Sequence, residues 1–258
     1  MIVADLHVHT KRSDGTLTLA AIPDAARRAA LETVAVTDHD RFHPDLSGPI
    51  ETRDGITIVH GIELRVETET QRLDLLGYGV DPTPELRRLT DDLQTNRIDR
   101  AGEIIERVEN RLDVTLDVEP RPGIGRPHIA TAIERSHAPY DYQAAFDELI
   151  GNDGPCFVPR DIPSFSAGRD CLGDACALVG LAHPFRYQSP EQALERARAL
   201  DAIEISYPYD LPVDTSQALA VADRHDLVIT GGSDAHDEQL GQAGLDRKEA
   251  DAFRSALH

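Results

Sequence analysis

Apolar side chains recur along this chain with two different spacings, one typical of strands and one typical of helices. Short runs rich in β-branched residues predict strands, whereas apolar positions that repeat every three to four residues predict helices. The first predicted strand starts at residues 2–4, and the others cover residues 33–37, 56–64, 72–78, 178–182, 202–206 and 227–230. The predicted helices cover residues 17–31, 85–112, 126–135, 142–149, 192–199 and 217–224. This alternation predicts an α/β fold with a parallel sheet.

The middle of the chain interrupts the alternation, because helical spacing dominates it. Pro82-Thr83-Pro84 marks the change, and no strand pattern returns before residue 160. A length of 258 residues suits one large barrel or two small domains. We therefore predict a barrel formed by residues 1–82 and 160–258, which carries residues 83–159 as a mostly helical insertion that roofs the active site.

Histidines and carboxylates follow the predicted strands at the ends where parallel strands would share one rim of the barrel. His7 and His9 are two positions apart on the first strand, so their side chains point the same way. The candidate metal ligands at or near this rim are His7, His9, Asp14, His39, Glu63, Asp74, His183, Asp234 and His236. Without a cation, so many titratable groups would include desolvated carboxylates that repel one another.

The composition of this ligand set indicates which metals it suits. Five histidines and four carboxylates favour Mn²⁺, Zn²⁺ or Fe²⁺, and Mg²⁺ fits less well because it prefers oxygen ligands. Nine ligands are too many for one ion. With Glu63 or another group as a bridge, they suit two or three ions about 3.5–4 Å apart, a geometry used for displacement at phosphorus.

The charge of the chain limits its partners. Its 26 basic and 46 acidic residues give a formal net charge of −20, and Lys11 and Lys248 are the only lysines. Such a composition is typical of a high-salt cytoplasm, and adaptation to a basic partner is the alternative interpretation. Long duplex DNA is excluded as a ligand, because binding its phosphates requires a basic track. We predict a cytoplasmic protein without membrane association, since no apolar run approaches the roughly 18 residues that span a bilayer.

Five motifs, in this order, resemble those of the polymerase and histidinol phosphatase (PHP) superfamily, and they extend from residue 1 to about residue 242. They are Asp5-Leu6-His7-Val8-His9-Thr10 with Ser13-Asp14-Gly15, Thr37-Asp38-His39-Asp40, Gly61-Ile62-Glu63, Ala182-His183-Pro184 and Gly232-Ser233-Asp234-Ala235-His236. Within the superfamily, the chain is most similar to the branch of nucleoside 3′,5′-bisphosphate phosphatases and 5′-3′ exoribonucleases. The shorter motifs that carry this second likeness are Arg97-Ile98-Asp99-Arg100-Ala101, Gly125-Arg126-Pro127-His128-Ile129-Ala130 and His183-Pro184-Phe185-Arg186-Tyr187.

The resemblance implies a distorted (β/α)₇ barrel that holds two or three metals and hydrolyses phosphate esters. The ligands implied by motif are His7, His9, Glu63 and Asp234 for one metal, Glu63, His183 and position 74 for a second, and Asp14, His39 and His236 for a third. Asp74 departs from the family, whose members usually have histidine at this position. Aspartate reaches less far and adds negative charge, so the occupancy or identity of the second metal is open.

The expected mechanism is attack on phosphorus by a metal-bound water, supported by Glu63, His183 and Asp234. The residues expected to bind substrate phosphate are Arg126, His128, Arg100 and Arg186, because guanidinium and imidazole groups donate to phosphate oxygens. Ordinary salt bridges are the alternative for Arg100 and Arg186.

Several neighbours of the predicted site suit supporting roles. Asp38 and Asp40 flank His39 and are expected to orient ligands rather than to bind metal. Glu204 ends a strand on the same rim, which indicates a minor pocket role. Tyr207 and Tyr209 are predicted either to stack on a base or to pack at the rim.

The expected substrate is a nucleotide or a short oligonucleotide with a terminal phosphate. A phosphomonoesterase of the histidinol phosphatase type is an alternative, which Arg126-Pro127-His128 disfavours. A metal-binding module without turnover is another, and the completeness of the ligand set disfavours it. An amidohydrolase is disfavoured because neither Lys11 nor Lys248 ends a predicted strand. The sequence leaves the oligomeric state open.

Overall fold

The computed structural model describes residues 1–257, and their contacts divide the chain into two compact units. Unit 1 combines residues 1–90 with the chain from residue 162 onward, and unit 2 comprises Asp91–Asp161. The predicted insertion, residues 83–159, begins earlier than unit 2, because the first turns of the connecting helix pack within unit 1. Leu86 is fully buried there, and the guanidinium of Arg87 lies 5.4 Å from the ring centre of Phe42.

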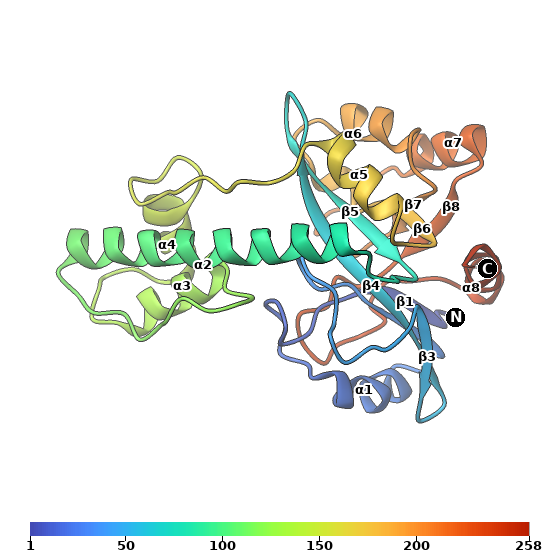
Figure 1. Ribbon diagram of the computed structural model, residues 1–258, viewed down its shortest axis with the longest axis horizontal. Helices are drawn as coiled ribbons and strands as arrows, with labels where there is room; N and C mark the ends of the chain where they lie inside the picture. The colour runs from blue at the N-terminus through green and yellow to red at the C-terminus, as the bar shows by residue number, and fades with distance from the viewer. Residues whose placement is uncertain (258) are drawn as a thin grey trace. The chain divides into compact units, whose positions relative to one another are not determined.

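Unit 1 is built on a nearly closed, barrel-shaped sheet, which confirms the predicted α/β barrel (Figure 1). Seven strands follow one another in the order β1-β2-β4-β5-β6-β7-β8, and β3 pairs only with β4. The backbone N–H of His9 donates to the carbonyl of Ala235 over 2.9 Å, which joins β1 to the segment after β8. The strands are β1 (Ala4–Val8), β2 (Thr33–Val36), β3 (Ile50–Arg53), β4 (Ile56–Glu67), β5 (Arg72–Tyr78), β6 (Leu178–Leu181), β7 (Ala202–Ser206) and β8 (Val228–Gly231).

The prediction of a parallel sheet is wrong for β5, and β3, which was not predicted, also pairs antiparallel. β5 runs antiparallel to both β4 and β6. The reason is the short connection between β4 and β5, where the N–H of Thr68 donates to the carbonyl of Gln71 over 2.9 Å. A tight turn can join only antiparallel strands, because a parallel crossover needs a dozen or more residues. The reversal leaves Asp74, near the start of β5, beside Arg65 near the end of β4.

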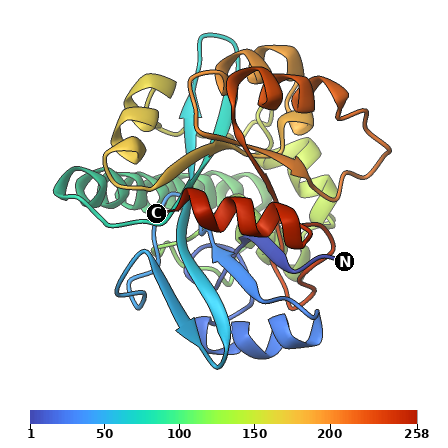
Figure 2. The same cartoon turned by 90° about the vertical axis from the view of Figure 1, so that its right-hand side faces the viewer.

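Helices cover the outside of the sheet. The helices of unit 1 are η1 (Leu19–Ala21), α1 (Ile22–Arg28), α5 (Phe165–Gly173), η3 (Pro184–Arg186), α6 (Pro190–Ala197), α7 (Ser216–His225) and α8 (Arg247–Ala256). The predicted helix 17–31 is too long at both ends, because Leu17 pairs with Thr10 and Ala30 adopts a left-handed φ of 57°. Figure 2 shows α8, in red, lying across the strands beside the N-terminal segment, and Phe253 packs edge-on against Tyr78 at 5.1 Å.

Unit 2 is helical, and it has an apolar core of its own. Ile104, Val108, Ile129 and Ile133 are buried together in this core. Helix α2 (Pro84–Leu112) is one continuous helix that starts in unit 1 and ends in unit 2. The other helices of the unit are α3 (Arg126–Arg135), α4 (Tyr142–Ala145) and the π-helical turn η2 (Phe146–Ile150). Within residues 1–257, no helix combines the length and the apolar character that crossing a membrane requires.

Candidate metal centre

All nine predicted metal ligands lie in unit 1, and the sheet brings their side chains together at one end of the barrel. Each comes from a strand or from the loop directly after it. The ligands are His7 on β1, His9 and Asp14 just beyond it, His39 after β2, Glu63 on β4, Asp74 on β5, His183 after β6, and Asp234 and His236 after β8. Three groups of these residues have ligand atoms within 4.8 Å of one another.

The first group consists of His7, His9 and Glu63, and we call it the His7 group. Nε2 of His7 lies 3.5 Å from Oε1 of Glu63, and Nε2 of His9 lies 3.4 Å from Oε2. Asp234 lies beside this group, with Oδ1 at 3.4 Å from Nε2 of His7 and 3.0 Å from Nε2 of His9. Two imidazoles and two carboxylates thus face a common point.

The second group, the Asp14 group, consists of His9, Asp14, His39 and His236. The carboxylate of Asp14 lies 3.6 Å from Nε2 of His39 and 3.3 Å from Nε2 of His236. The rings of His9 and His236 are stacked with their centres 4.3 Å apart. This group is more open to solvent, since the His236 side chain is 40% exposed.

The third group, the Asp74 group, consists of Glu63, Asp74 and His183. Nε2 of His183 lies 3.1 Å from Oε1 of Glu63 and 3.8 Å from Oδ2 of Asp74. Asp74 also pairs with Arg65, which the sequence analysis did not identify. Glu63 belongs to both the His7 and Asp74 groups, and its Oε2 lies 2.6 Å from Nδ1 of His39.

Buried polar atoms that make no well-aligned hydrogen bond mark where cations fit. These atoms include Nε2 of His7, both ring nitrogens of His9, Oδ1 of Asp14, Oε2 of Glu63 and Oδ1 of Asp234. Leaving one such atom unpaired costs about 1–3 kcal/mol, so their concentration at one place requires compensation. Divalent ions would satisfy the nitrogen and oxygen lone pairs together, and this mixed donor set suits Mn²⁺, Zn²⁺ or Fe²⁺.

The electrostatics of the cluster also show a demand for positive charge. Burial disfavours the charged form of Glu63, but His39 and His7 outweigh it and hold the pKa of Glu63 well below its usual value. Burial likewise opposes charge on His7, yet the carboxylates of Glu204, Asp234 and Glu63 raise the pKa of His7 well above its usual value. The carboxylates therefore stay ionised and draw positive charge to the centre.

Buried carboxylates beneath the cluster hold the ligands in place. Both oxygens of Glu204 lie near Nδ1 of His7, at 3.1 and 3.3 Å, and Oε2 accepts the backbone N–H of His183 over 2.7 Å. Asp38 accepts from the N–H of Thr10 and from the hydroxyl of Ser13, at 2.8 and 2.6 Å, which fixes the loop that carries Asp14. The sequence suggested an orienting role for Asp38 but only a minor role for Glu204.

Asp5 is a further supporting carboxylate that sequence reasoning missed. Its oxygens accept the N–H groups of Ser233 and Gly241, at 2.9 and 2.8 Å, and the Ser233 hydroxyl. The signal in the sequence was its alternation with His7, which places both side chains on one face of β1. Asp5 thereby ties the first strand to the loop that carries Asp234.

Backbone conformation at the ligands is also specialised. His183 and Asp234 adopt φ angles of 28° and 51°, a region that residues other than glycine rarely enter and that is often found at functional sites. Gly232 permits a close approach, because a Cβ there would lie 2.4 Å from the backbone nitrogen of His7. Gly232 is thereby explained by its packing against β1, and Gly231 by its close approach to Ser206 of β7.

The residues predicted to bind phosphate fall in different units. Arg186 lies at the rim in unit 1, where Nη1 donates to Oδ2 of Asp234 over 3.1 Å and to the Tyr207 hydroxyl over 2.7 Å. Tyr207 also donates to Oδ2 of Asp234 over 2.9 Å, and its ring centre lies 4.8 Å from that of Tyr209.

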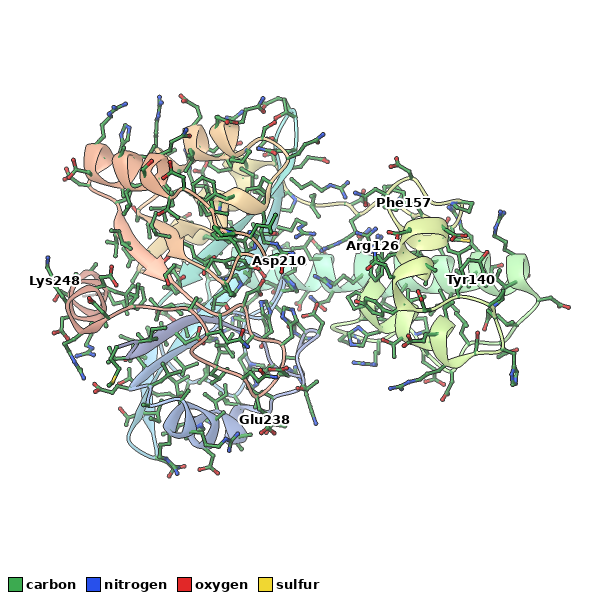
Figure 3. The ribbon with its side chains drawn as sticks, turned by 180° about the vertical axis from the view of Figure 1, so that it is seen from behind. Arg126, Tyr140, Phe157, Asp210, Glu238 and Lys248 are labelled. Carbon is green, nitrogen blue, oxygen red and sulfur yellow. The ribbon has the colours of Figure 1, made fainter. Side chains whose placement is uncertain are left out.

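Arg100, Arg126 and His128 lie in unit 2, and each forms hydrogen bonds there. Arg126 donates from Nη1 to the carbonyl of Ile150 over 3.1 Å, and its position is labelled in Figure 3. Arg100 donates from Nε to the carbonyl of Val158 over 2.6 Å, and Nδ1 of His128 accepts the N–H of Gly125 over 3.1 Å.

The barrel and its convergent ligand set define a metal-dependent phosphoesterase, a hydrolase of phosphoric esters. The sequence model of the PHP domain matches residues 5–150, more than half of the chain. The chain belongs to the PHP domain family, as its motifs predict.

Three relatives that are named by their activities align with most of the chain. It is 28% identical to the 3′,5′-nucleoside bisphosphate phosphatase of Chromobacterium violaceum, over 94% of this chain and 89% of that one. The chain is 27% identical to the 5′-3′ exoribonuclease Rnm of Escherichia coli, over 91% of this chain and 85% of that one. Identity to the phosphoribosyl 1,2-cyclic phosphate 1,2-diphosphodiesterase of Eggerthella lenta is 29%, over 91% and 94%.

A solved structure shares the fold. A protein of Bifidobacterium adolescentis, assigned as a metal-dependent phosphoesterase, superposes with a TM-score of 0.82 at 24% identity, over 100% of this chain and 97% of that one. At this identity the likeness concerns the fold.

Proposed function

We propose that this chain hydrolyses phosphate esters of nucleotides, either nucleoside 3′,5′-bisphosphates or short 5′-phosphorylated oligonucleotides. The observation that carries the proposal is the cluster of buried imidazole and carboxylate atoms that make no well-aligned hydrogen bond at the rim of the barrel. The names of the Chromobacterium violaceum and Escherichia coli relatives support a nucleotide or RNA substrate.

The nine predicted ligands are proposed to hold two or three ions of Mn²⁺, Zn²⁺ or Fe²⁺. Such ions supply Lewis acidity, which activates water for attack on phosphorus and neutralises charge on the phosphoryl oxygens. The chain's own residues set the geometry. Glu204 orients His7 so that Nε2 faces the centre, while Tyr207 and Arg186 hold Oδ2 of Asp234 and leave Oδ1 directed at His7 and His9.

Substrate phosphate is proposed to be bound by guanidinium and imidazole donors. The Arg186 side chain is 54% exposed at the rim, and its guanidinium has more N–H donors than its bonds to Asp234 and Tyr207 use. We propose phosphate binding by Arg100, Arg126 and His128 as well, on the basis of the motifs that carry them. Substitution of a phosphate-binding arginine should raise KM more than it lowers kcat.

The substrate class is tested by turnover with Mn²⁺ at high salt, comparing four compounds in parallel. These are adenosine 3′,5′-bisphosphate, a 5′-phosphorylated trinucleotide, a ribose 1,2-cyclic phosphate and histidinol phosphate. We expect the first or second to be hydrolysed fastest. Preferential hydrolysis of histidinol phosphate or of the cyclic phosphate would overturn the substrate assignment.

The site is tested by Asp234→Ala, which removes the carboxylate shared by His7 and His9. We expect loss of bound metal and loss of turnover with the fold retained. Asp237→Ala, three residues further on, is the matched control, because its carboxylate is exposed and accepts hydrogen bonds from the backbone and side chain of Gln239. Full activity in Asp234→Ala would refute the proposed site.

A further inference from the structure

The pairing of Arg65 with Asp74 distinguishes the Asp74 group from the other two groups. The two residues are directly opposite each other in the register of β4 and β5. Nε of Arg65 donates to Oδ1 of Asp74 over 2.7 Å, and Nη2 donates to Oδ2 over 2.6 Å. This bidentate arrangement is the strongest geometry for a guanidinium and a carboxylate, and it engages both oxygens of Asp74.

The carboxylates of the other groups are in a different state. Oδ1 of Asp14, Oε2 of Glu63 and Oδ1 of Asp234 are buried and make no well-aligned hydrogen bond, and the polar atoms near them are ring nitrogens of other predicted ligands. Nε2 of His7 and Nε2 of His9, which face Asp234 and Glu63, likewise make no well-aligned hydrogen bond. The demand for a cation is thus concentrated in the His7 and Asp14 groups.

Within the Asp74 group, the facing atoms already have partners. Nε2 of His183, the ring nitrogen nearest Glu63 and Asp74, is hydrogen-bonded to Oε1 of Glu63 over 3.1 Å. Nδ1 of the same ring lacks a partner, but it is not the atom that faces these two carboxylates. The Asp74 side chain is only 2% exposed, so its charge needs a close counter-ion, and Arg65 supplies it.

A guanidinium is charged at all ordinary pH values, so this counter-ion cannot leave by losing a proton. A dication that binds Asp74 would have to displace the guanidinium of Arg65 from both carboxylate oxygens. Otherwise it would bind in contact with the positive charge of that guanidinium, which repels it. Both alternatives weaken metal binding at the Asp74 group.

From these contacts we propose that Arg65 neutralises Asp74 in place of a metal ion, so that divalent ions occupy the His7 and Asp14 groups but not the Asp74 group. The inference rests on the proposed metal centre and deepens it by assigning its occupancy. The chain would then work as a two-metal phosphoesterase with an arginine at the third cation position.

The test measures how many metal ions each chain holds. The full-length protein is stripped with a chelator, reloaded with Mn²⁺, desalted and analysed by mass spectrometry of the metal. We expect two ions per chain in the wild type and three in Arg65→Met, which frees Asp74. Arg72→Met is the matched control, because Arg72 lies on the same hairpin and pairs with exposed Glu67, and it should retain two.

The possible outcomes separate this inference from the proposed function. Three ions in the wild type, or an unchanged count in Arg65→Met, would overturn the role of Arg65. No bound ion in the wild type would instead overturn the metal centre itself.

A second measurement does not depend on the folding of a variant. Anomalous diffraction from wild-type crystals at the manganese edge should show two peaks, neither within bonding distance of Asp74. A peak bonded to Asp74 would refute the inference whatever the variants do. If Arg65→Met folds, Mn²⁺ should also raise its melting temperature more than it raises that of the wild type, since the freed carboxylate gains a counter-ion only from the metal.

Discussion

Glu204 gives the sharpest test of how the chain prepares its histidines for metal. It is completely buried, and its two oxygens face two N–H donors, Nδ1–H of His7 and the backbone N–H of His183. The proton held on Nδ1 makes Nε2 of His7, which faces Glu63 and Asp234, the nitrogen that would give up its proton and coordinate a bound cation. Glu204 therefore selects the tautomer that can bind a metal.

We predict that Glu204→Gln preserves the shape of this site but destroys its pattern of donors. An amide has one oxygen, which can accept from His183 or from His7 but not equally well from both. If the amide nitrogen faces His7, Nδ1 must become the acceptor and Nε2 takes the proton. If the amide nitrogen faces His183, its N–H meets the backbone N–H of His183, and neither donor has an acceptor.

The size of the effect follows from the cost of the unsatisfied buried group. That cost is about 1–3 kcal/mol. It corresponds to roughly 5- to 150-fold in affinity, because 1.4 kcal/mol is a factor of ten. We therefore expect Mn²⁺ affinity to fall by about 10- to 100-fold, measured by competition with a fluorescent chelator at pH 8.

Asp201→Asn provides the matched control for this substitution. Asp201 also accepts a backbone N–H, that of Val179 over 2.9 Å, but it lies just before β7 whereas Glu204 lies within the strand. It should leave Mn²⁺ affinity unchanged. Unchanged affinity in folded Glu204→Gln, or an equal loss in Asp201→Asn, would refute tautomer selection by Glu204.

Two further predictions concern stability. Asp38→Ala removes three hydrogen bonds to a buried carboxylate, so the free energy of unfolding measured in urea should fall by about 3–5 kcal/mol, while Asp38→Asn should lose less than half of that. A smaller loss in Asp38→Ala would mean that the loop carrying Asp14 is held by other contacts. Burial and nearby His43 lower the pKa of His60 to about 4, below its value in the unfolded chain, so the unfolded chain takes up the proton first as pH falls. Between pH 7 and pH 5 the wild type should therefore lose about 2 kcal/mol more stability than His60→Leu. Parallel loss in both proteins would show that His60 is not buried in its neutral form.

The sequence correctly predicted those helices and strands that are defined by residues close together along the chain. Strands 72–78 and 202–206 and the helix 126–135 have the predicted bounds, because each combines a clear period with a turn or proline at its edge. The rule that ligands lie at the ends of strands also identified the histidines and carboxylates that the structure brings together. This rule needs only the position of each residue relative to its own strand.

The wrong predictions concern which strands pair and in which direction, because the spacing of apolar residues along the chain does not encode strand pairing. The direction of β5 depends on the length of the turn before it, and the strand β3 is defined by a hairpin with β4. Asp54-Gly55 was an available signal for that hairpin, because the two residues have φ angles of 49° and 82° in a tight turn between the strands. The capping box of Asp246 and Glu249 was likewise a signal for α8, which was not predicted.

The sequence alone does not reveal Arg65 as the partner of Asp74, because only the antiparallel register of β4 and β5 places the two residues opposite each other. The buried carboxylates of the site differ in which groups contact their two oxygens. Asp5, Asp38 and Glu204 spend both oxygens on N–H or O–H donors, so they are supports. Asp14, Glu63 and Asp234 each keep an oxygen that makes no well-aligned hydrogen bond and that faces ring nitrogens of other proposed ligands.

By the same criterion Asp74 belongs with the supports, because Arg65 occupies both of its oxygens. A histidine at this position could not have made that bidentate pair, since an imidazole presents a single acceptor nitrogen. The aspartate that departs from the pattern implied by the family motifs is thus the residue that makes the pair with Arg65 possible. In the proposed occupancy, Asp74 forms an ion pair within the β4–β5 hairpin instead of coordinating a metal.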